Sequence, residues 1–507
     1  MLSKTIALGI QGIEAQIVDV EVDIIRGLPN FSIVGLPDST IKESKERIRS
    51  AIENSGFEFV PKNFVVNLAP AGFKKQGSAF DLAIAMAILQ ATNQIDFDPS
   101  KIPLVGELSL DGSIKPVKGV ISMVIAIYKA GYHKIIVPYQ NRKEACAVDG
   151  VAVYPVKTIA DVVNIFHTNV EPYKNNDIED DYDNNQNYLD FQMICGQESV
   201  KRAVEIAAAG HHNMIMYGPP GSGKTMIARA IPTILPDLSF DESISTTMIH
   251  SISGHLLPAK GLLKTPPFRS PHHTSSDVAL VGGGKIPFAG EISLAHNGIL
   301  FLDEFIEFRS NVLQSLRQPL EDLKITVSRA AGSSVFPSDF MLIAASNPCC
   351  CGYLFDPEVK CTCAASQIQN YFKKISGPVL DRFDIEIYVP RVPYKQLIGK
   401  IHSEPSYTIK KRVQNARDIQ SDRFSGKLLK YNSRVSTEDI RNFCPLSPDI
   451  EAFYERAAES LNLSARAFFK IIKVARTIAD LENCVDISKN HIVEALSYKN
   501  LQKYYKI

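Results

Sequence analysis

One eight-residue segment constrains the fold of this chain more than any other feature. Residues 218–225 read GPPGSGKT and stand between the apolar run NMIMY and the segment MIARAI. A strand, a glycine-rich loop ending in Gly-Lys-Thr and a helix make up a phosphate-binding P-loop. The glycines let successive backbone N–H groups converge on phosphate oxygens, helped by the positive end of the helix. The segment therefore predicts an α/β nucleotide-binding core.

The loop also predicts which residues bind ATP and Mg²⁺. Lys224 should reach the β- and γ-phosphates, and Thr225 should bind Mg²⁺ through its hydroxyl. A glycine-rich turn with a chance lysine is the alternative, and the flanking strand and helix make it the weaker one. The predicted nucleotide-binding residues are Gly218, Pro219, Pro220, Gly221, Ser222, Gly223, Lys224 and Thr225.

An acidic pair supplies the expected partner of the P-loop. The apolar segment GILFLDEF (298–305) ends in adjacent carboxylates. Asp303 is expected to hold Mg²⁺ together with Thr225, and Glu304 to polarise the attacking water. A carboxylate at a strand end can instead cap the next helix. The P-loop upstream favours the catalytic interpretation.

Three more polar residues follow in an informative order. The strand-like segment MLIAASNP (341–348) ends in Asn347, which is placed to orient water or sense the γ-phosphate. Arg382 in GPVLDRFDI and Arg466 in SARAF have the charge that stabilises a transferring phosphoryl group, including one on a neighbour's ATP. Taken singly, either arginine is more simply a surface or salt-bridge residue. The order of the whole set favours the catalytic hypothesis.

This ordered set resembles the core of an AAA+ ATPase, and longer segments narrow the resemblance to the magnesium-chelatase-like ComM/YifB competence-protein family. The resemblance implies a homo-hexameric ring with ATP bound at subunit interfaces. It also implies that Arg382 is a trans-acting arginine finger and that Arg466 is the sensor of a helical lid. The segments that carry it are GQESVKRAVEIAAAGHHNMIMYGPPGSGKT, PFRSPHHTSSDVALVGGG, GEISLAHNGILFLDE, LRQPLED, ISGPVLDRFDI and LSARAFFKIIKVARTIADL.

The N-terminal region resembles a Lon-protease-type domain through GFKKQGSAFDLAIAMAIL and GELSLDGSIKPVKGVISMVIAIYKAG. A proteolytic domain of that type needs a serine and a lysine that activates it. The serine position falls on Ala79 and the lysine position on Ile121, whereas Ser78 is offset by one residue and Lys118 by three. We therefore expect a structural or DNA-contacting role rather than proteolysis.

The 507 residues divide into four expected regions. They are a Lon-protease-like α+β domain (1–168), an acidic and Asn-rich linker (169–191), an AAA+ P-loop α/β core (192–392) and a helical C-terminal lid (393–507). The linker has too few aliphatic residues to fold alone. Within the first region, FSIVGL and FVVNLAP read as strands, and AFDLAIAMAILQA and ISMVIAIYKAG as buried helices.

Two insertions are candidates for contact with DNA. The stretch 267–290 has glycine, histidine and basic residues without a helical period and predicts a projecting loop, whereas 320–340 predicts a β-hairpin. Lysine and arginine on such segments grip a phosphate backbone or simply solvate exposed loops. The histidines His272 and His273 are either ordinary polar groups, which we favour, or metal ligands. The candidate DNA contacts are Arg269, Lys285, Lys324 and Arg329.

Five of the nine cysteines fall within residues 349–363. The pairs Cys349/Cys351 and Cys361/Cys363 suit a tetrahedral Zn²⁺ site, but Cys-x-Cys is tighter than the usual spacing and Cys350 is an extra thiol. Reduced free thiols are the equal alternative. A metal there would brace the strand that ends in Asn347 rather than take part in chemistry.

Composition limits the remaining function classes. Lys+Arg and Asp+Glu both number 55, so no overall basic charge points to nucleic acid, and no apolar run approaches a membrane span. An odd cysteine count without a secretion signal favours the cytoplasm. We expect an ATP-hydrolysing hexamer that acts as a branch-migration helicase on single-stranded or branched DNA in recombination or natural transformation. The rival is a chelatase-like or chaperone-type ATPase that remodels a protein partner.

Overall fold

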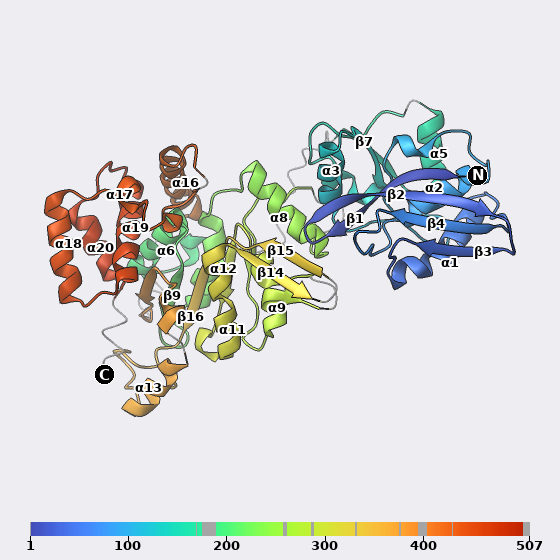
Figure 1. The fold of residues 1–507 in the computed structure, drawn as a ribbon. Helices are drawn as coiled ribbons and strands as arrows, with labels where there is room; N and C mark the ends of the chain where they lie inside the picture. The colour runs from blue at the N-terminus through green and yellow to red at the C-terminus, as the bar shows by residue number, and fades with distance from the viewer. Residues whose placement is uncertain are drawn as a thin grey trace.

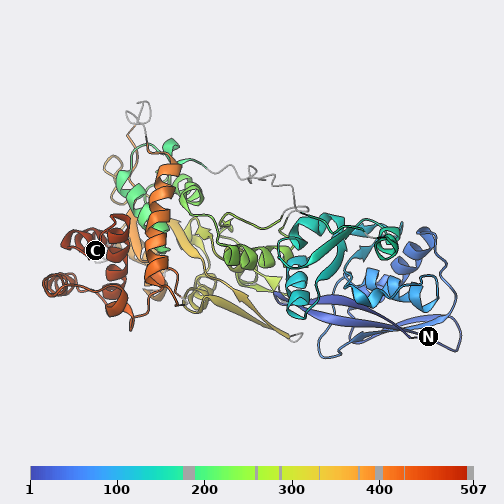
Figure 2. The same ribbon diagram turned by 90° about the horizontal axis from the view of Figure 1, so that it is seen from above.

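The computed structural model describes residues 2–168, 170–174, 189–256, 261–284, 288–329, 332–374, 377–393, 403–427 and 429–499. The candidate DNA contact Lys285 and most of the expected linker lie outside these residues. Three parts follow one another along an elongated molecule (Figures 1 and 2). The N-terminal part lies at one end, a part built on a parallel sheet lies in the middle, and helices of the C-terminal part lie at the other end.

The N-terminal part is built on a four-stranded sheet with the order β1-β2-β4-β3. Its strands are β1 (Ser3–Gln11), β2 (Glu14–Ile25), β3 (Asn30–Val34) and β4 (Asn63–Ala69). Short strands form two further pairs, β5 (Glu107–Leu108) with β6 (Ile114–Lys115) and β7 (Lys134–Pro138) with β8 (Ala152–Val156). The strands predicted in FSIVGL and FVVNLAP are therefore confirmed as β3 and β4.

Helices complete this part: α1 (Ser39–Asn54), α2 (Asp81–Ala91), α3 (Val120–Lys129), α4 (Arg142–Ala145) and α5 (Ile159–His167). The predicted buried helices are confirmed as α2 and α3. Nearly every residue of α2 is buried, which explains why its sequence is apolar on all sides rather than amphipathic.

The central part contains a five-stranded sheet with the order β10-β13-β16-β9-β17, in which all neighbouring strands are parallel. Its strands are β9 (Met214–Tyr217), β10 (Phe268–Arg269), β13 (Ile299–Leu302), β16 (Met341–Ser346) and β17 (Ile385–Tyr388). Every residue of β9, β13 and β16 is buried. Central parallel strands are covered on both faces, so they read as continuous apolar runs.

Helices flank this sheet and connect its strands. They are α6 (Glu198–Gly210), α7 (Lys224–Ala230), α8 (Phe240–Ile252), α9 (Asp277–Val281), α10 (Glu291–Leu294), α11 (Ser310–Ser315), α12 (Arg317–Asp322), α13 (Ala365–Lys373) and α14 (Gly377–Leu380).

The two insertions differ in how well the sequence predicted them. The hairpin expected within 320–340 is confirmed as β14 (Lys324–Arg329) paired with β15 (Gly332–Pro337). The loop expected over 267–290 is wrong in its described residues, which contain β10, α9 and the pair β11 (Gly282–Gly283) with β12 (Phe288–Ala289). A helix of one turn is too short to show a period, and Ser276 caps it by accepting from the N–H of Ala279.

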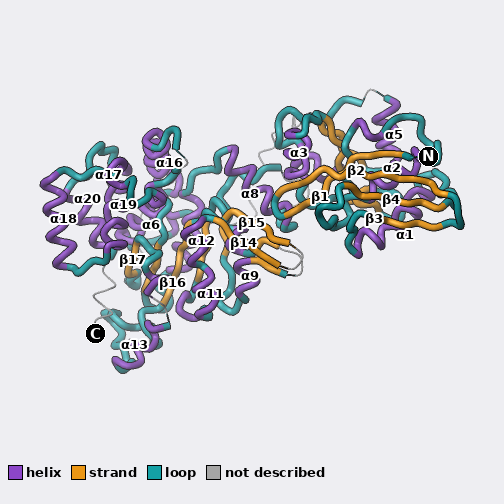
Figure 3. The backbone as a smooth tube through the Cα atoms, in the orientation of Figure 1, coloured by secondary structure: helices purple, strands orange, loops and turns teal. Residues whose placement is uncertain are grey.

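The C-terminal part is helical, as predicted (Figure 3). It consists of α16 (Ser406–Arg423), α17 (Ile440–Phe443), α18 (Pro448–Ser460), α19 (Ala465–Leu481) and α20 (Lys489–Ser497). One hydrophobic cluster continues from the sheet through α6 into α16, α19 and α20. Phe191, at the expected end of the linker, is buried in the same cluster, and its N–H donates to the Ser406 hydroxyl.

Helix α8 joins the central part to the N-terminal part. The Ser251 hydroxyl of α8 accepts from the N–H of Gly119 at 2.8 Å and donates to the Glu144 carboxylate at 2.5 Å. Burial raises the pKa of Glu144, and the hydrogen bond from Ser251 opposes this shift. The hairpin β14–β15 also approaches the N-terminal part, since a Cβ on Gly12 would lie 3.3 Å from that of Ser334.

In the part of the chain that the structure describes, no helix is long and apolar enough to cross a membrane.

Candidate active site

The predicted phosphate-binding and acidic residues gather at one edge of the central sheet. Strand β9 leads into the P-loop, β13 leads into Asp303 and Glu304, and β16 leads into Asn347. Because these strands are parallel neighbours, their carboxyl ends lie side by side. Open parallel sheets bind ligands at this edge. Residues separated by more than 120 positions in the chain are thereby brought to one site.

The backbone of the P-loop explains its glycines. Gly221 and Gly223 have φ of +76° and +89°, a region that side chains disfavour. Gly218 is needed for a different reason, since a Cβ there would lie 2.3 Å from the carbonyl oxygen of Val389. The loop therefore keeps its shape through both conformation and close packing.

Lys224 is buried and is held by oxygen acceptors. Its Nζ donates to the carbonyls of Gly218 at 2.7 Å and Pro219 at 3.0 Å, and to Oδ1 of Asn347 at 3.3 Å. Burial lowers the pKa of Lys224 to about 8, and the Asp303 carboxylate acts in the opposite direction. A buried cation held by neutral oxygens is matched to an anionic ligand such as a polyphosphate.

The residues expected to bind Mg²⁺ are in contact. The Thr225 hydroxyl donates to Oδ2 of Asp303 at 2.7 Å. Hydroxyl and carboxylate oxygens are ligands that Mg²⁺ accepts, together with phosphate oxygens and water. The buried Ser222 hydroxyl beside them has no hydrogen-bond partner among the described residues, as expected of a group that awaits a phosphate oxygen. The donor set therefore fits a magnesium–nucleotide complex.

Glu304 has a partner that the sequence did not reveal. Its backbone is left-handed, with φ of +51°, and its Oε2 lies 2.8 Å from Nδ1 of His273. Left-handed backbone in a residue with a side chain is costly and concentrates at functional sites. The sequence favoured an ordinary polar role for His272 and His273. His272 fits it, since its ring contacts the Thr274 hydroxyl at 2.8 Å, whereas His273 holds the candidate catalytic carboxylate.

Gln197 is a second residue that sequence reasoning left unassigned. Its side-chain amide donates to the carbonyls of Ser222 at 2.9 Å and Pro390 at 2.7 Å. It therefore ties the P-loop to the segment after β17. Its position in GQES, just before α6, was the only sequence signal for it.

The two candidate arginines lie elsewhere. Arg382 precedes β17, and its carbonyl accepts from Asn213, the residue before β9. Both strands then run toward the carboxyl edge, so Arg382 lies at the opposite, amino edge of the sheet. Arg382 binds the carboxylate of Glu321 on α12, and Arg466 lies 3.9 Å from the same group. The structure brings the two arginines together, but not with their own chain's P-loop.

The candidate DNA contacts are separated from one another. Arg269 in β10 makes two hydrogen bonds to Glu291, at 2.6 and 2.7 Å, so its charge is already paired. Lys324 begins the hairpin and is exposed. Arg329 ends strand β14 near the tip of the same hairpin. No ion pair of Lys324 occurs among the residues that the structure describes.

The candidate metal site is compact. The sulfur atoms of Cys349, Cys351, Cys361 and Cys363 all lie within 4.8 Å of one another. Cys350, which left the ligand set open in the sequence, is exposed and outside this group.

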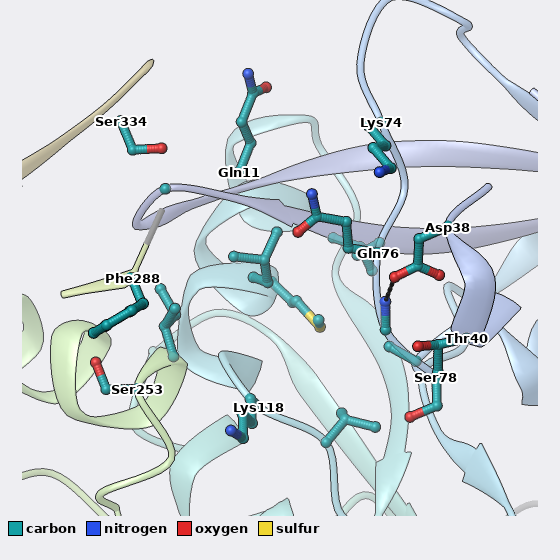
Figure 4. A pocket seen from close by; sticks show the side chains of 18 of the residues that line it. Gln11, Asp38, Thr40, Lys74, Gln76, Ser78, Lys118, Ser253, Phe288 and Ser334 are labelled. Carbon is teal, nitrogen blue, oxygen red and sulfur yellow. Dashed lines mark hydrogen bonds between the residues drawn. The ribbon is translucent and has the colours of Figure 1, made fainter. Parts of the chain in front are cut away.

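A groove of about 560 Å³ lies between the N-terminal and central parts, and we call it the interdomain groove (Figure 4). Ala79, at the expected serine position, lines it, whereas Ile121, at the lysine position, is buried in α3. Ser78 lines the groove but donates its hydroxyl to Glu107. Ser253, Phe288 and Ser334 close it from the central part (Figure 4).

Comparisons with known proteins agree with this architecture. The family profile "Magnesium chelatase, subunit ChlI" matches residues 190–397, and the profiles "Subunit ChlI of Mg-chelatase" and "Magnesium chelatase, subunit ChlI C-terminal" match residues 20–141 and 403–499. The N-terminal part is similar to Lon protease 2 of Bacillus subtilis, with 30% identity over 128 residues, 25% of this chain and 23% of that protein.

Two relatives match nearly the whole chain. "Competence protein ComM" of Haemophilus influenzae is 41% identical over 96% of this chain and 95% of its own length. "Uncharacterized protein YifB" of Escherichia coli is 39% identical over 97% of this chain and 96% of its own length. The chain therefore belongs to the ComM/YifB family of magnesium-chelatase-like AAA+ ATPases.

Proposed function

We propose that this protein is an ATP-driven motor that assembles into a homo-hexameric ring and moves strands at DNA branches during recombination or natural transformation. The observation that carries the proposal is the separation of its charged groups. Lys224, Thr225 and Asp303 lie at the carboxyl edge of the sheet, and Arg382 lies at the amino edge. A four-residue strand spans about 13 Å, so the backbone of Arg382 lies about a strand's length from its own nucleotide site.

A ring resolves this separation. Neighbouring copies related by rotation place the amino edge of one subunit against the carboxyl edge of the next. Arg382 and Arg466 then supply positive charge to the phosphates held by the adjacent P-loop. An arginine provided in this way stabilises the charge that develops during phosphoryl transfer. The C-terminal helices that carry Arg466 act as the lid of the site.

Within one subunit, each remaining residue has a distinct role. Lys224 and the loop N–H groups bind the phosphates of ATP, and Thr225 and Asp303 hold Mg²⁺, which neutralises phosphate charge when bound. Glu304 accepts the proton of the attacking water, and Asn347 orients that water and reports the γ-phosphate to β16. His273 keeps the Glu304 carboxylate in place.

The proposal of DNA as the polymer rests on two points. The name of the Haemophilus relative, competence protein ComM, favours work on incoming DNA. The exposed Lys324 opens a β-hairpin that extends from the ring core, and six copies would concentrate its charge around a channel. We propose that the protein works in the cytoplasm, because ATP and DNA are both present there.

The test is an ATPase measurement with and without DNA. We expect forked and four-way junction DNA to raise the ATPase rate and the protein to move the branch point. Lys224→Ala should abolish both activities, and Lys324→Ala should reduce the DNA response while leaving the basal rate intact. An ATPase rate that no DNA changes, with no movement of a branch, would overturn the DNA proposal. Stimulation by a protein partner instead would favour a chelatase-like or chaperone-type motor.

A further inference from the structure

The cysteines that follow β16 form a cluster outside the ATPase machinery. The four sulfur atoms come from two short segments, 349–351 and 361–363, on either side of a nine-residue loop. Cys349 is fully buried and the other three are partly buried. No catalytic role that we assign uses them.

The distances in this cluster match a metal site. Sulfur–sulfur separations are 3.3 Å for Cys349–Cys351, 3.5 Å for Cys351–Cys361 and 3.7 Å for Cys349–Cys361. Four thiolates at about 2.3 Å from a tetrahedral Zn²⁺ ion are separated by about 3.8 Å. Disulfide sulfurs lie at about 2.0 Å, which none of these pairs approaches. The geometry therefore suits zinc rather than cross-links.

The backbone around the sulfurs also suits a metal. N–H groups of Tyr353 and Thr362 point at the sulfur of Cys351, and that of Leu354 points at Cys349. Such donors outside the ligand shell stabilise thiolate charge and fix the orientation of the ligands. The turn between Cys349 and Cys351 is closed by Gly352, whose N–H donates to the carbonyl of Cys349 and whose φ is +84°.

We propose that Cys349, Cys351, Cys361 and Cys363 bind one structural Zn²⁺ ion and that this zinc loop (residues 349–363) braces the P-loop. A Cβ on Gly352 would lie 2.6 Å from Cδ of Pro220, so the turn of the zinc loop packs directly on the phosphate-binding loop. The loop also begins two residues after Asn347, whose Oδ1 accepts from Lys224. The ion thus holds a loop that packs on the phosphate-binding loop at Pro220 and that follows Asn347, an acceptor of Lys224.

A second cluster shows why the cysteine set is the better candidate. Glu482, Cys484 and His491 also come within reach of one ion. Their charges, however, are already used, since Glu482 binds His491 at 3.0 Å and Arg202 at 3.2 Å. A set whose charges are satisfied by internal ion pairs needs no metal. Thiols are weak hydrogen-bond donors and acceptors, so four adjacent thiols satisfy one another poorly.

The test is the metal content of the full-length protein. Inductively coupled plasma mass spectrometry should find about one zinc ion per chain in the wild type. Cys351→Ser and Cys361→Ser should each contain less than about one-fifth of that amount. Cys350→Ser is the matched control, because Cys350 is exposed and outside the cluster, and it should keep its zinc. Cobalt substitution of the wild type should give sulfur-to-cobalt charge-transfer bands, which needs no variant to fold.

The proposed bracing of the P-loop by the zinc loop is tested by nucleotide binding. Removal of zinc with a chelator that spares Mg²⁺ should weaken binding of a fluorescent ATP analogue severalfold, and added zinc should restore it. Wild-type protein without zinc, or with iron in its place, would overturn the zinc assignment, as would loss of zinc in Cys350→Ser. Zinc present with unchanged nucleotide affinity after its removal would overturn the bracing. None of these outcomes depends on DNA.

Discussion

The P-loop site and the interdomain groove are two polar sites of the same chain that differ in whether the expected reactive residues are present. At the P-loop, Lys224 and the Thr225 hydroxyl converge on the same acidic edge of the sheet. In the groove, the expected nucleophile is Ala79 and the expected lysine is a buried Ile121. The groove has polar lining residues but lacks the reactive pair. The fold alone therefore does not decide which cavity reacts, and the residues in the cavity do.

The largest effect should come from the P-loop lysine. Lys224→Ala removes the only buried cation that contacts the loop carbonyls in the described site, and we expect the ATPase rate to fall by at least about a thousandfold. Lys74→Ala is the matched control, because Lys74 lines the interdomain groove and is exposed. A steady-state ATPase assay compares the two. Equal losses in both variants would break the contrast between the two sites.

The arginine at the opposite edge should have the next largest effect. Arg382→Ala should lower kcat by about a hundredfold to a thousandfold, with nucleotide affinity nearly unchanged, because in the proposed ring the arginine acts on a neighbour's phosphates. Glu321→Gln is the control, since Glu321 is the partner of Arg382 within the chain. It should retain most activity. Single-turnover ATPase and nucleotide-binding assays compare the two variants. If Arg382 only forms a structural ion pair, both variants should lose activity equally.

These two sites also show how far sequence reasoning reaches. The P-loop, the acidic strand and the hairpin are encoded locally, by glycines, apolar runs and alternation, so they were predictable. The pairing of His273 with Glu304 was not, because the two residues belong to separate segments that only the folded sheet brings together. Glu321 was missed for the same reason. The contact of Gly352 with Pro220 and the exclusion of Cys350 depend on a loop conformation that no periodicity encodes.

The pH dependence of nucleotide binding should follow the lowered pKa of Lys224. With a pKa of about 8, the lysine is charged below that pH and loses its charge above it. Bound phosphates favour the charged form, so affinity should be constant below pH 7 and fall by about tenfold between pH 7 and pH 9. Lys224→Arg should bind with little change over the same range, because arginine stays charged. A wild-type affinity that is flat to pH 9 would contradict this account.

A smaller effect should separate the two adjacent histidines. His273→Ala frees the Glu304 carboxylate and should lower kcat severalfold, with KM for ATP little changed. His272→Ala is the matched control, because its ring contacts Thr274 and not the acidic pair. Similar rates in the two variants would remove His273 from its positioning role. His273→Asn, which keeps a hydrogen-bonding side chain, should recover part of the rate.

The smallest effects should come from the interdomain groove. Ser78 is the hydroxyl nearest in sequence to the missing nucleophile, but it donates to the Glu107 carboxylate and not to the lysine that a proteolytic domain of this type uses. We expect no peptidase activity from the wild type on unfolded protein substrates. Ser78→Ala should leave the ATPase rate unchanged and lower the free energy of unfolding by about 1 kcal/mol, the usual value of one hydrogen bond.

Thr40→Ala is the control for Ser78→Ala, because Thr40 is another hydroxyl residue that lines the same groove (Figure 4). A peptidase activity that Ser78→Ala abolishes and Thr40→Ala retains would show that Ser78 acts as the nucleophile, although it is offset by one residue from the expected position. The contrast between the two sites would then be wrong. Without such activity, the groove is only the place where residues of the N-terminal part face residues of the central part. Its hairpin contact at Gly12 and Ser334 then connects the N-terminal part to the segment that carries Lys324.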